Sequence, residues 1–293
     1  MNLLNRKANL NVKVAGLTWI VVAGLNFVGF VVLIKYVGSD LPPVQAAFIR
    51  YLFGLIVLLP LFVRNGIQIF STKHIYLHGL RGFVQAMAVM LWFYAVTKLP
   101  IAEVTALGFV SPIFVVFGAV FFLRERLTKP RIAAVVLGLV GIFVILRPGF
   151  GVINSGSIAM LLAAPLFAAS KVMTKFLVRY DSGSTIVVYL SIFAALTMAV
   201  PAISVWIQPS GINLLLLSGT ALFATMAHLC MARGLALVDL TVSQPIDFLQ
   251  LVWTTLIGVM LFSEPSVIWV WIGGGIVVVS ATYIARFESK GNH

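Results

Sequence analysis

The sequence predicts an all-α polytopic membrane protein with ten transmembrane helices, arranged as two inverted five-helix repeats with both termini in the cytoplasm. Its composition, its long apolar runs and an internal repeat lead to this prediction. Hydrophobic residues make up 61% of the 293 residues and charged residues only 10%, and the mean hydropathy is +1.10. Because such a chain has too little polar surface to dissolve as a globule, we expect it to lie in the lipid bilayer.

Apolar runs of about twenty residues follow one another along the chain, and each is long enough to cross a hydrocarbon core ~30 Å thick. They predict helices, because the strands of a membrane barrel alternate polar and apolar residues over about ten positions. The ten runs lie near 14–35, 43–63, 75–97, 101–123, 131–147, 157–178, 184–206, 212–236, 240–262 and 266–286.

Polar and turn-forming residues separate these runs. Met1 to Lys13 is polar and basic, and the run that follows is too long for the apolar core of a signal peptide. Gly38 to Pro42 separates the first two runs, and Lys98 to Pro100 separates the third from the fourth. Ser263 to Pro265 separates the last two. Links this short leave no room for a soluble domain.

Lys and Arg residues indicate the orientation of a membrane protein, because they accumulate in its cytoplasmic loops. With the N-terminus inside, most of the twenty, Arg81 and Lys175 among them, lie at or near cytoplasmic ends. The others are Lys35, Lys98 and Arg147 outside, and Arg50 and Lys171 within runs. Both termini are therefore predicted to be cytoplasmic. The net charge of +12 is scattered over separate loops, so it does not predict nucleic-acid binding.

The chain divides near Gly149 into two halves, 1–148 and 149–293, that carry five runs each. Landmarks of the first half return about 139 residues later, where Glu125 falls on Glu264 and Leu99 on Val238. Since five is odd, the second copy enters the membrane upside down relative to the first. Repeats of this kind are mostly used by carriers.

Spaced Pro, Glu and Gly residues occur together in the first half. They lie in Trp92 to Leu107, Ser111-Pro112, Leu123-Arg-Glu-Arg-Leu127, Gly138, Gly141 and Arg147-Pro148. This pattern resembles the EamA-type repeat of the drug/metabolite transporter superfamily. The second copy keeps Glu264, but Gln250-Leu251 stands in place of the Ser-Pro pair. The resemblance covers nearly all of both halves, and it implies a ten-helix carrier with a central cavity that moves small organic metabolites by alternating access.

Three segments look closest to the branch that contains bacterial riboflavin and S-adenosylmethionine uptake proteins: Leu80 to Phe83, Phe93 to Ala95 and Leu99 to Ala102. The resemblance implies a secondary transporter of the cytoplasmic (inner) membrane of a bacterium, with riboflavin or a similar ring-containing metabolite such as S-adenosylmethionine as its small-molecule substrate. An exporter of amino acids or related metabolites is the alternative. A channel or an enzyme is less favoured, since no filter signature, nucleophile with a base or phosphate loop is visible. We expect no catalytic residue, cofactor or metal, and a homodimer stays open.

Polar residues inside apolar runs are the candidates for cargo binding, because an ionisable group at mid-membrane costs ~2.5–3.5 kcal/mol on insertion scales. Asp247 is the foremost case, and Gln244, Asp247 and Gln250 recur every third residue along one helical face. The 139-residue offset places Thr105, Gly108 and Ser111 over those three positions. We interpret the two stripes as facing walls of one cavity, in which Pro245 and Pro112 free backbone carbonyls.

A structural role competes with this interpretation. Asp247 could instead pair with Arg50 or Lys171 to hold the halves together. Arg50 lies about two turns inside the second run and resembles a basic residue common at this place in the family, and this resemblance favours a structural or gating pair over ligand contact. Lys171 is close enough to the inner end to reach the surface with its ammonium group. His228 in the eighth run is a further gating candidate, although a single histidine on a helix more often serves packing.

Aromatic and amide side chains complete the set of expected cargo contacts. Gln85 and Trp92 share a face of the third run with Arg81. Trp92, Tyr94 and Trp19 could stack on a planar ring for ~0.5–1.5 kcal/mol per contact, although such residues near span ends usually form the interfacial belt. Asn26 is a further polar candidate.

Two remaining patterns predict architecture rather than cargo binding. Glu125 and Glu264 stand at loop junctions, where a carboxylate can cap a helix start or pair with Arg124 or Arg126. Gly138 with Gly141 predicts close packing between helices.

Overall fold

The computed structural model describes residues 3–37, 40–99, 104, 107–108, 110–146, 154–262 and 268–289, and this part of the chain is helical without a β-strand. The first half forms α1 (Leu3–Val37), α2 (Pro43–Val57), α3 (Leu59–Asn65), the short 3-10 helix η1 (Gly66–Phe70), α4 (Ile75–Lys98), α6 (Ser111–Leu123) and α7 (Lys129–Leu146). The second half forms α8 (Ser155–Leu177), α9 (Gly183–Ser204), α10 (Gly211–Leu237), α11 (Leu240–Asp247), α12 (Leu249–Phe262) and α13 (Ile268–Ser289).

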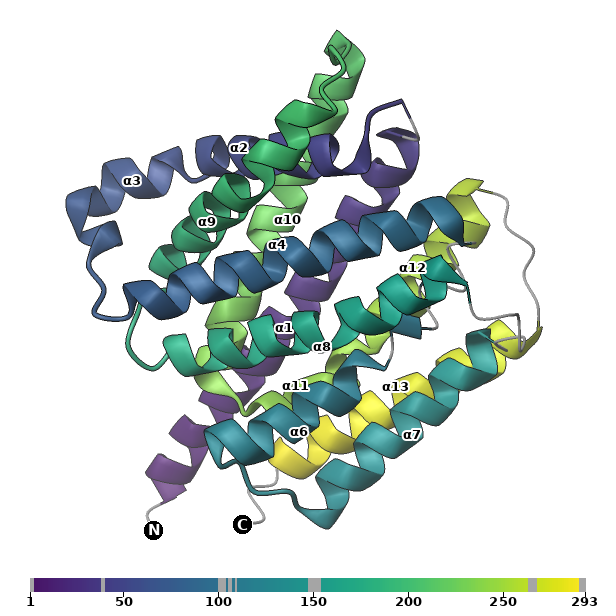
Figure 1. Cartoon of the computed structure of the whole chain (residues 1–293). Coiled ribbons are helices and arrows are strands. Elements are labelled where there is room, and N and C mark those ends of the chain that lie inside the picture. The colour runs from purple at the N-terminus through teal and green to yellow at the C-terminus, as the bar shows by residue number, and fades with distance from the viewer. Residues whose placement is uncertain are drawn as a thin grey trace.

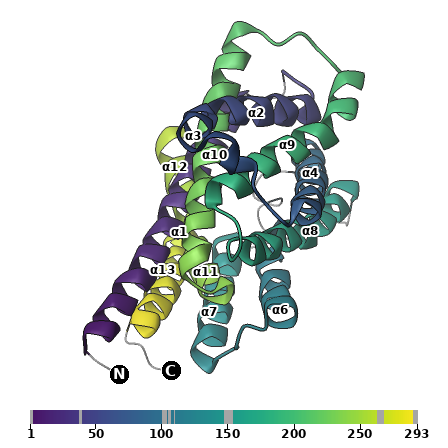
Figure 2. The ribbon, with the colours of Figure 1, turned by 90° about the vertical axis from the view of Figure 1, so that its left-hand side faces the viewer.

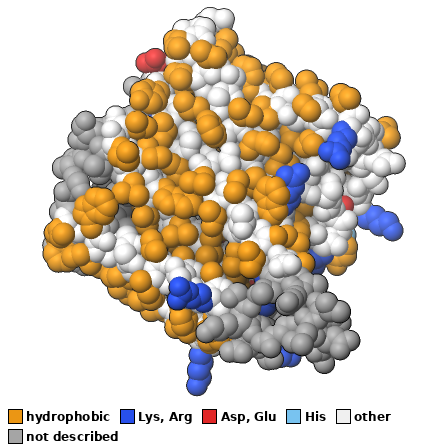
Figure 3. All heavy atoms as spheres, turned by 180° about the vertical axis from the view of Figure 1, so that it is seen from behind, with side chains coloured by type: hydrophobic (Ala, Val, Ile, Leu, Met, Phe, Trp, Pro, Cys, Tyr) orange, Lys and Arg blue, Asp and Glu red, His pale blue; other side chains and the backbone are white. Residues whose placement is uncertain are grey.

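The helices have the length and polarity of membrane-spanning segments. In the part of the chain that the structure describes, five segments are long and apolar enough to cross a bilayer: Asn11–Val37, Pro43–Phe70, Ser155–Leu177, Gly183–Ser204 and Gly211–Leu237. Large hydrophobic side chains are exposed on most helices, and Figure 3 shows them spread over one face with few charged side chains among them. Lipid solvates such a surface, whereas water does not. An all-helical membrane fold, as expected from the sequence, follows from this surface.

The two halves of the chain are packed into each other. The most extensive contacts between helices all join the first half to the second, with α1 on α10, α4 on α8, α7 on α13 and α2 on α9. These pairs are also exchanged between the halves. The helix of the first apolar run in one half packs on the helix of the third run in the other half, as α1 does on α10 and α8 on α4. Neither half therefore forms a separate packed body.

Glycines allow the closest of these approaches. A Cβ atom on Gly141 of α7 would lie 2.8 Å from the carbonyl oxygen of Gly273 in α13, and one on Gly138 would lie 2.2 Å from the Phe248 ring. A Cβ atom on Gly234 of α10 would lie 3.0 Å from the carbonyl oxygen of Gly16 in α1. The close packing predicted at Gly138 and Gly141 is confirmed, and no larger residue fits there without moving a helix.

Several helices begin at a side chain that accepts hydrogen bonds from the first free N–H groups. Asn154 accepts from the N–H groups of Gly156 (2.8 Å) and Ser157 (3.0 Å) at the start of α8. Ser182 and Ser210 cap α9 and α10 in the same way. Pro112 is the second residue of α6, a position at which a missing N–H is tolerated. The described residues Val104, Leu107 and Gly108 ahead of it are helical and Val110 lies in a turn, in agreement with the expected helix interruption next to Pro112.

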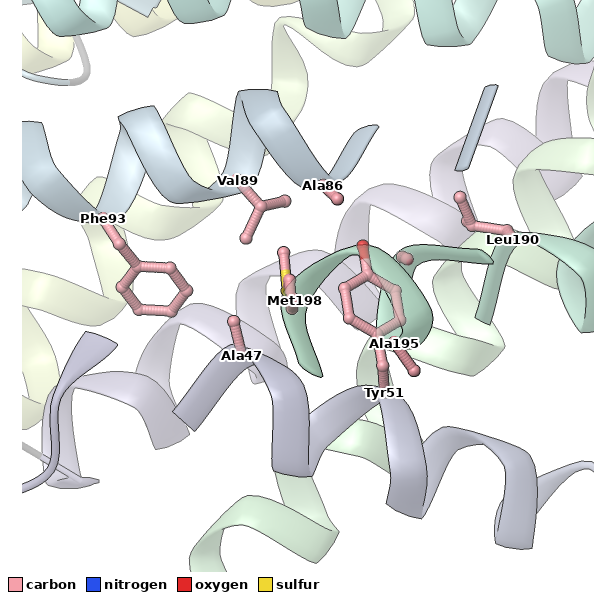
Figure 4. Close-up of a cluster of buried hydrophobic side chains, with 9 residues drawn as sticks. Ala47, Tyr51, Ala86, Val89, Phe93, Leu190, Ala195 and Met198 are labelled. Atoms are coloured by element: carbon pink, nitrogen blue, oxygen red, sulfur yellow. The ribbon is translucent and has the colours of Figure 1, made fainter. Parts of the chain in front are cut away.

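Figure 1 shows the start of α1 and the end of α13 at the same end of the molecule, and Figure 2 shows the same after a quarter turn. Between α2, α4 and α9 lies a compact apolar cluster that includes Ala47, Tyr51, Phe93 and Met198. In Figure 4 the Tyr51 ring extends from α2 with its oxygen directed toward α4. This cluster joins helices of both halves and positions the polar residues next to it.

Candidate functional site

A group of polar side chains surrounds Asp247 at the end of α11. The Lys171 ammonium group on α8 donates a hydrogen bond to Asp247 Oδ2 and forms an ion pair with it. Ser243 Oγ and Gln244 Nε2 each lie 3.4 Å from the same oxygen, and Gln244 also donates to Ser243 Oγ at 2.8 Å. We call Lys171, Ser243, Gln244 and Asp247 the acid–lysine cluster. It places two opposite charges inside the helical part of the protein, which is costly unless they are paired or line a water-accessible path.

The helix that carries Asp247 is interrupted beside it. α11 ends at Asp247 and α12 begins at Leu249, with a turn at Phe248 between them whose backbone keeps α-helical dihedral angles (φ −61°, ψ −24°). Pro245 lies inside α11 and has no N–H to donate to the Thr241 carbonyl four residues earlier. Broken helices of this kind provide backbone acceptors at binding sites of membrane carriers.

The structure divides the predicted stripe of three residues. Gln244 is buried within the acid–lysine cluster, whereas Gln250 belongs to α12 and its Cβ lies 3.8 Å from the Cβ position of Gly24 on α1. On the opposite stripe, Ser111 is half-buried at the start of α6. Thr105 lies outside the described residues, as do Arg147 and Glu264.

The partner of Asp247, which the sequence left open, is Lys171. Arg50 forms no ion pair with a carboxylate among the described residues, so the pairing of Asp247 with Arg50 is wrong. Arg50 is instead buried in α2, with its guanidinium carbon 3.8 Å from the centre of the Tyr51 ring and 5.6 Å from that of Phe30. The two candidate basic residues thus serve different sites.

Arg50 belongs to a second polar group formed by α2, α4 and α10. Arg81 is buried in α4 and donates from Nη1 to the Ile186 carbonyl on α9 at 3.0 Å. It interacts electrostatically with Tyr51, and His228 interacts electrostatically with both arginines. We call Arg50, Tyr51, Arg81 and His228 the arginine cluster. The His228 ring also meets Phe27 edge-on at 5.4 Å.

The other expected cargo residues lie at several places in the bundle. Gln85 is buried in α4, and the half-buried Trp92 packs against Phe93 one residue on. Tyr94 is exposed and donates to Ser155 Oγ at 3.2 Å. Trp19 lies under the guanidinium group of Arg233 at 5.0 Å. Asn26 donates to the Val22 carbonyl one turn earlier at 2.8 Å.

Sequence reasoning missed two polar contacts that join helices in this region. Arg81 and Lys175 were interpreted as cytoplasmic orientation signals, but both are buried. Lys175 Nζ donates to the carbonyl groups of Leu235 (2.7 Å) and Val238 (2.6 Å) at the end of α10. For Arg81 the available signal was its position six residues inside α4, which begins at Ile75. Lys175 lies in the last turn of α8, where a basic residue also suits an orientation signal, so nothing in the sequence indicated its burial.

The Glu125 carboxylate joins the two halves at the start of α11. Its Oε1 accepts from the Leu240 N–H at 2.7 Å, and its Oε2 accepts from the Thr241 N–H at 3.0 Å and the Thr241 hydroxyl at 2.9 Å. Arg131 of α7 pairs with Asp239, just before the same helix, at 2.8 Å. The predicted cap at Glu125 is confirmed, and the helix that it caps belongs to the other half.

Comparison with known proteins agrees with a helical bundle of two copies. The model of the EamA-like transporter family matches residues 14–147 and again residues 154–286. The chain belongs to the EamA-like transporter family. It is accordingly a multi-pass membrane protein that transports a metabolite.

Relatives with assigned functions cover almost the whole chain. A riboflavin transporter of Vibrio cholerae is 31% identical over 280 residues, or 94% of either protein. One of Brucella anthropi is 30% identical over 86% of this chain and 90% of the relative. An S-adenosylmethionine uptake transporter of Rickettsia felis is 28% identical over 96% and 95%. A solved crystal structure with 18% identity superposes with a TM-score of 0.79 over 94% of this chain and 99% of that chain, which shows a shared fold.

Proposed function

We propose that this transporter is a carrier of ten membrane crossings in the inner membrane of a bacterium, with two inverted repeats and both termini in the cytoplasm. Support comes from the helices, which lie where the sequence has its ten apolar runs. The start of α1 and the end of α13 also share one end of the molecule. The exchange of helix pairs between the halves is the pattern that two related copies produce when they pack around a common axis. Alternating access then consists of rocking one set of helices against the other.

We propose that the cargo is a small ring-containing metabolite, either riboflavin or S-adenosylmethionine. The observation that carries this assignment is the similarity, at 28–31% identity over nearly the full length, to relatives named for those two compounds. The aromatic side chains Trp92, Phe93 and Phe27 near the polar clusters suit a planar ring.

The acid–lysine cluster is proposed as part of the cargo path. The side chains of Lys171 and Asp247 are about one-fifth exposed, although both lie between helices. Asp247 also stands at a helix interruption. A polar group of the cargo can replace either partner of the ion pair, because breaking the pair without a replacement would leave a buried charge. Binding of cargo would thereby be coupled to separation of α8 from α11.

Export is the second candidate direction. A relative from Pseudomonas aeruginosa named as a pseudopaline exporter is 24% identical over 96% of this chain and 99% of its own length. The same scaffold is therefore compatible with outward transport, and the direction is a property to be measured.

Transport in proteoliposomes tests the proposal. We expect saturable uptake of labelled riboflavin or S-adenosylmethionine that is accelerated by unlabelled cargo on the opposite side. Asp247→Asn should lower this exchange by about tenfold or more, since a partner of the cargo site is lost. Asp40→Asn is the matched control, because Asp40 is exposed before α2. Flux that rises linearly with cargo concentration would indicate a channel, and exchange of neither compound would refute the cargo assignment.

A further inference from the structure

Three polar atoms of the arginine cluster are buried without a hydrogen-bond partner among the described residues. They are Arg50 Nε, Tyr51 Oη and Arg81 Nε. The residues are 6%, 2% and 3% exposed, so bulk water does not reach them freely. An unsatisfied buried donor costs free energy, and one on a charged group costs more than one on a neutral group.

Among the described residues, no carboxylate forms an ion pair with either guanidinium group. Asp181, Asp239 and Asp247 pair with His78, Arg131 and Lys171, and Glu125 caps α11. Asp40 is exposed in the turn before α2. Within the described residues, the groups recorded around the arginine cluster are the Phe30 and Tyr51 rings, the Ile186 carbonyl, and the imidazoles of His228 and of His78, which is itself paired with Asp181. None of these carries a full negative charge.

The geometry points to a binding partner of definite chemistry. A guanidinium group presents several N–H donors in one plane, and this fork matches the two oxygens of a carboxylate or phosphate group. The Tyr51 hydroxyl adds a neutral donor beside it, and the Phe30 and Phe27 rings provide apolar contact for the rest of a ligand. We propose that the arginine cluster binds a carboxylate or phosphate group of the transported metabolite.

This inference rests on the proposed function and deepens it, because it separates the two cargo classes. S-adenosylmethionine carries a carboxylate group, whereas riboflavin carries no negative group and gains one only as its 5′-phosphate. The cluster therefore favours a cargo with an oxyanion over the uncharged vitamin. Arg50 would then contact cargo, rather than serve the gating pair that its position in the sequence favours.

The test compares ligands that differ only in the oxyanion, bound to the full-length protein in lipid nanodiscs. The pairs are S-adenosylmethionine with its decarboxylated analogue, riboflavin 5′-phosphate with riboflavin, and inorganic phosphate with chloride at equal ionic strength. The member with the oxyanion should bind about tenfold more tightly. Preference in the first pair alone identifies a carboxylate, and preference in the second and third identifies a phosphate. Absence of preference in all three pairs overturns the inference.

Arg50→Met should reduce this preference to within about twofold and leave the affinity for the member of each pair that lacks the oxyanion nearly unchanged. It should also leave the melting temperature of the ligand-free protein equal to or higher than that of the wild type, because an unbalanced buried charge is removed.

Arg233→Met is the matched control, since the Arg233 side chain is exposed and its guanidinium group lies over the Trp19 ring, outside the arginine cluster. If Arg50→Met does not fold, Arg50→Lys and Tyr51→Phe replace it.

A purely structural role for Arg50 would lower the melting temperature of Arg50→Met and leave the ligand preference intact, and this result would overturn the inference. The inference would also be overturned if both Arg50→Met and Arg81→Met still bound the ligands that carry an oxyanion more tightly than those without one. Exchange of uncharged riboflavin in proteoliposomes, together with absence of any oxyanion preference, would refute this inference while leaving the proposed function standing.

Discussion

Replacing Glu125 with alanine removes three hydrogen bonds that join the loop after α6 to the first turn of α11. Leu240 and Thr241 are fully buried, so water does not replace the carboxylate at their N–H groups. An unsatisfied buried N–H costs about 1–3 kcal/mol, and loss of a negative charge at a helix start costs about 0.3–1 kcal/mol more. We therefore expect a loss of about 3 kcal/mol or more.

Thermal unfolding in detergent measures this loss. At roughly 2–4 °C per kcal/mol, the melting temperature of Glu125→Ala should fall by about 6–12 °C. Thr241→Val removes the hydroxyl's contacts with Glu125 (2.9 Å) and Arg131 Nη1 (3.3 Å) but keeps both N–H bonds to the carboxylate, and it should cost about a third as much. Arg126→Ala is the control, because the carboxylate could have paired with that exposed neighbour. A loss in Arg126→Ala as large as that in Glu125→Ala would refute the helix cap, as would an unchanged melting temperature in Glu125→Ala.

Two further outcomes follow from the packing of the helices. Lys171→Met or Asp247→Leu alone should destabilise the protein by about 3–5 kcal/mol, whereas the double variant should regain most of that loss without regaining transport. This is checked by melting temperature and exchange on the same preparations, and full activity of the double variant would contradict a role in cargo movement. Gly141→Ala should lower stability by about 1–3 kcal/mol, because its Cβ would press on the backbone of α13. Gly211→Ala, where a Cβ meets no neighbour within 4 Å, should be neutral in the same melting assay.

Part of the site could be predicted because its signals are local. A charged residue far from both ends of an apolar run is visible in the sequence, and this was sufficient to select Asp247, Lys171 and Arg50 as functional candidates. A carboxylate at a loop junction predicts a helix cap, as at Glu125. In each case the chemistry of the residue was evident, while its partner was not.

The partners depend on how the helices are rotated and packed, which periodicity does not encode. Asp247 pairs with Lys171 on α8 rather than with Arg50 on α2. Gln250 belongs to α12, beyond the turn at Phe248, and its Cβ lies 3.8 Å from the Cβ position of Gly24 on α1, a neighbour that the sequence does not indicate. Glu125 caps a helix that begins 115 residues later.

The sequence by itself determined that this chain is a helical membrane protein of two related halves and that it resembles a family of metabolite carriers, because hydropathy, run length and short motifs are local properties. The tertiary structure decided that the halves interlock and that Arg50, Tyr51 and Arg81 gather without a carboxylate among the described residues. Only the tertiary structure decides these points, because burial and pairing depend on contacts between helices that are far apart in the chain. The free energy of a buried charge depends on all the groups around it.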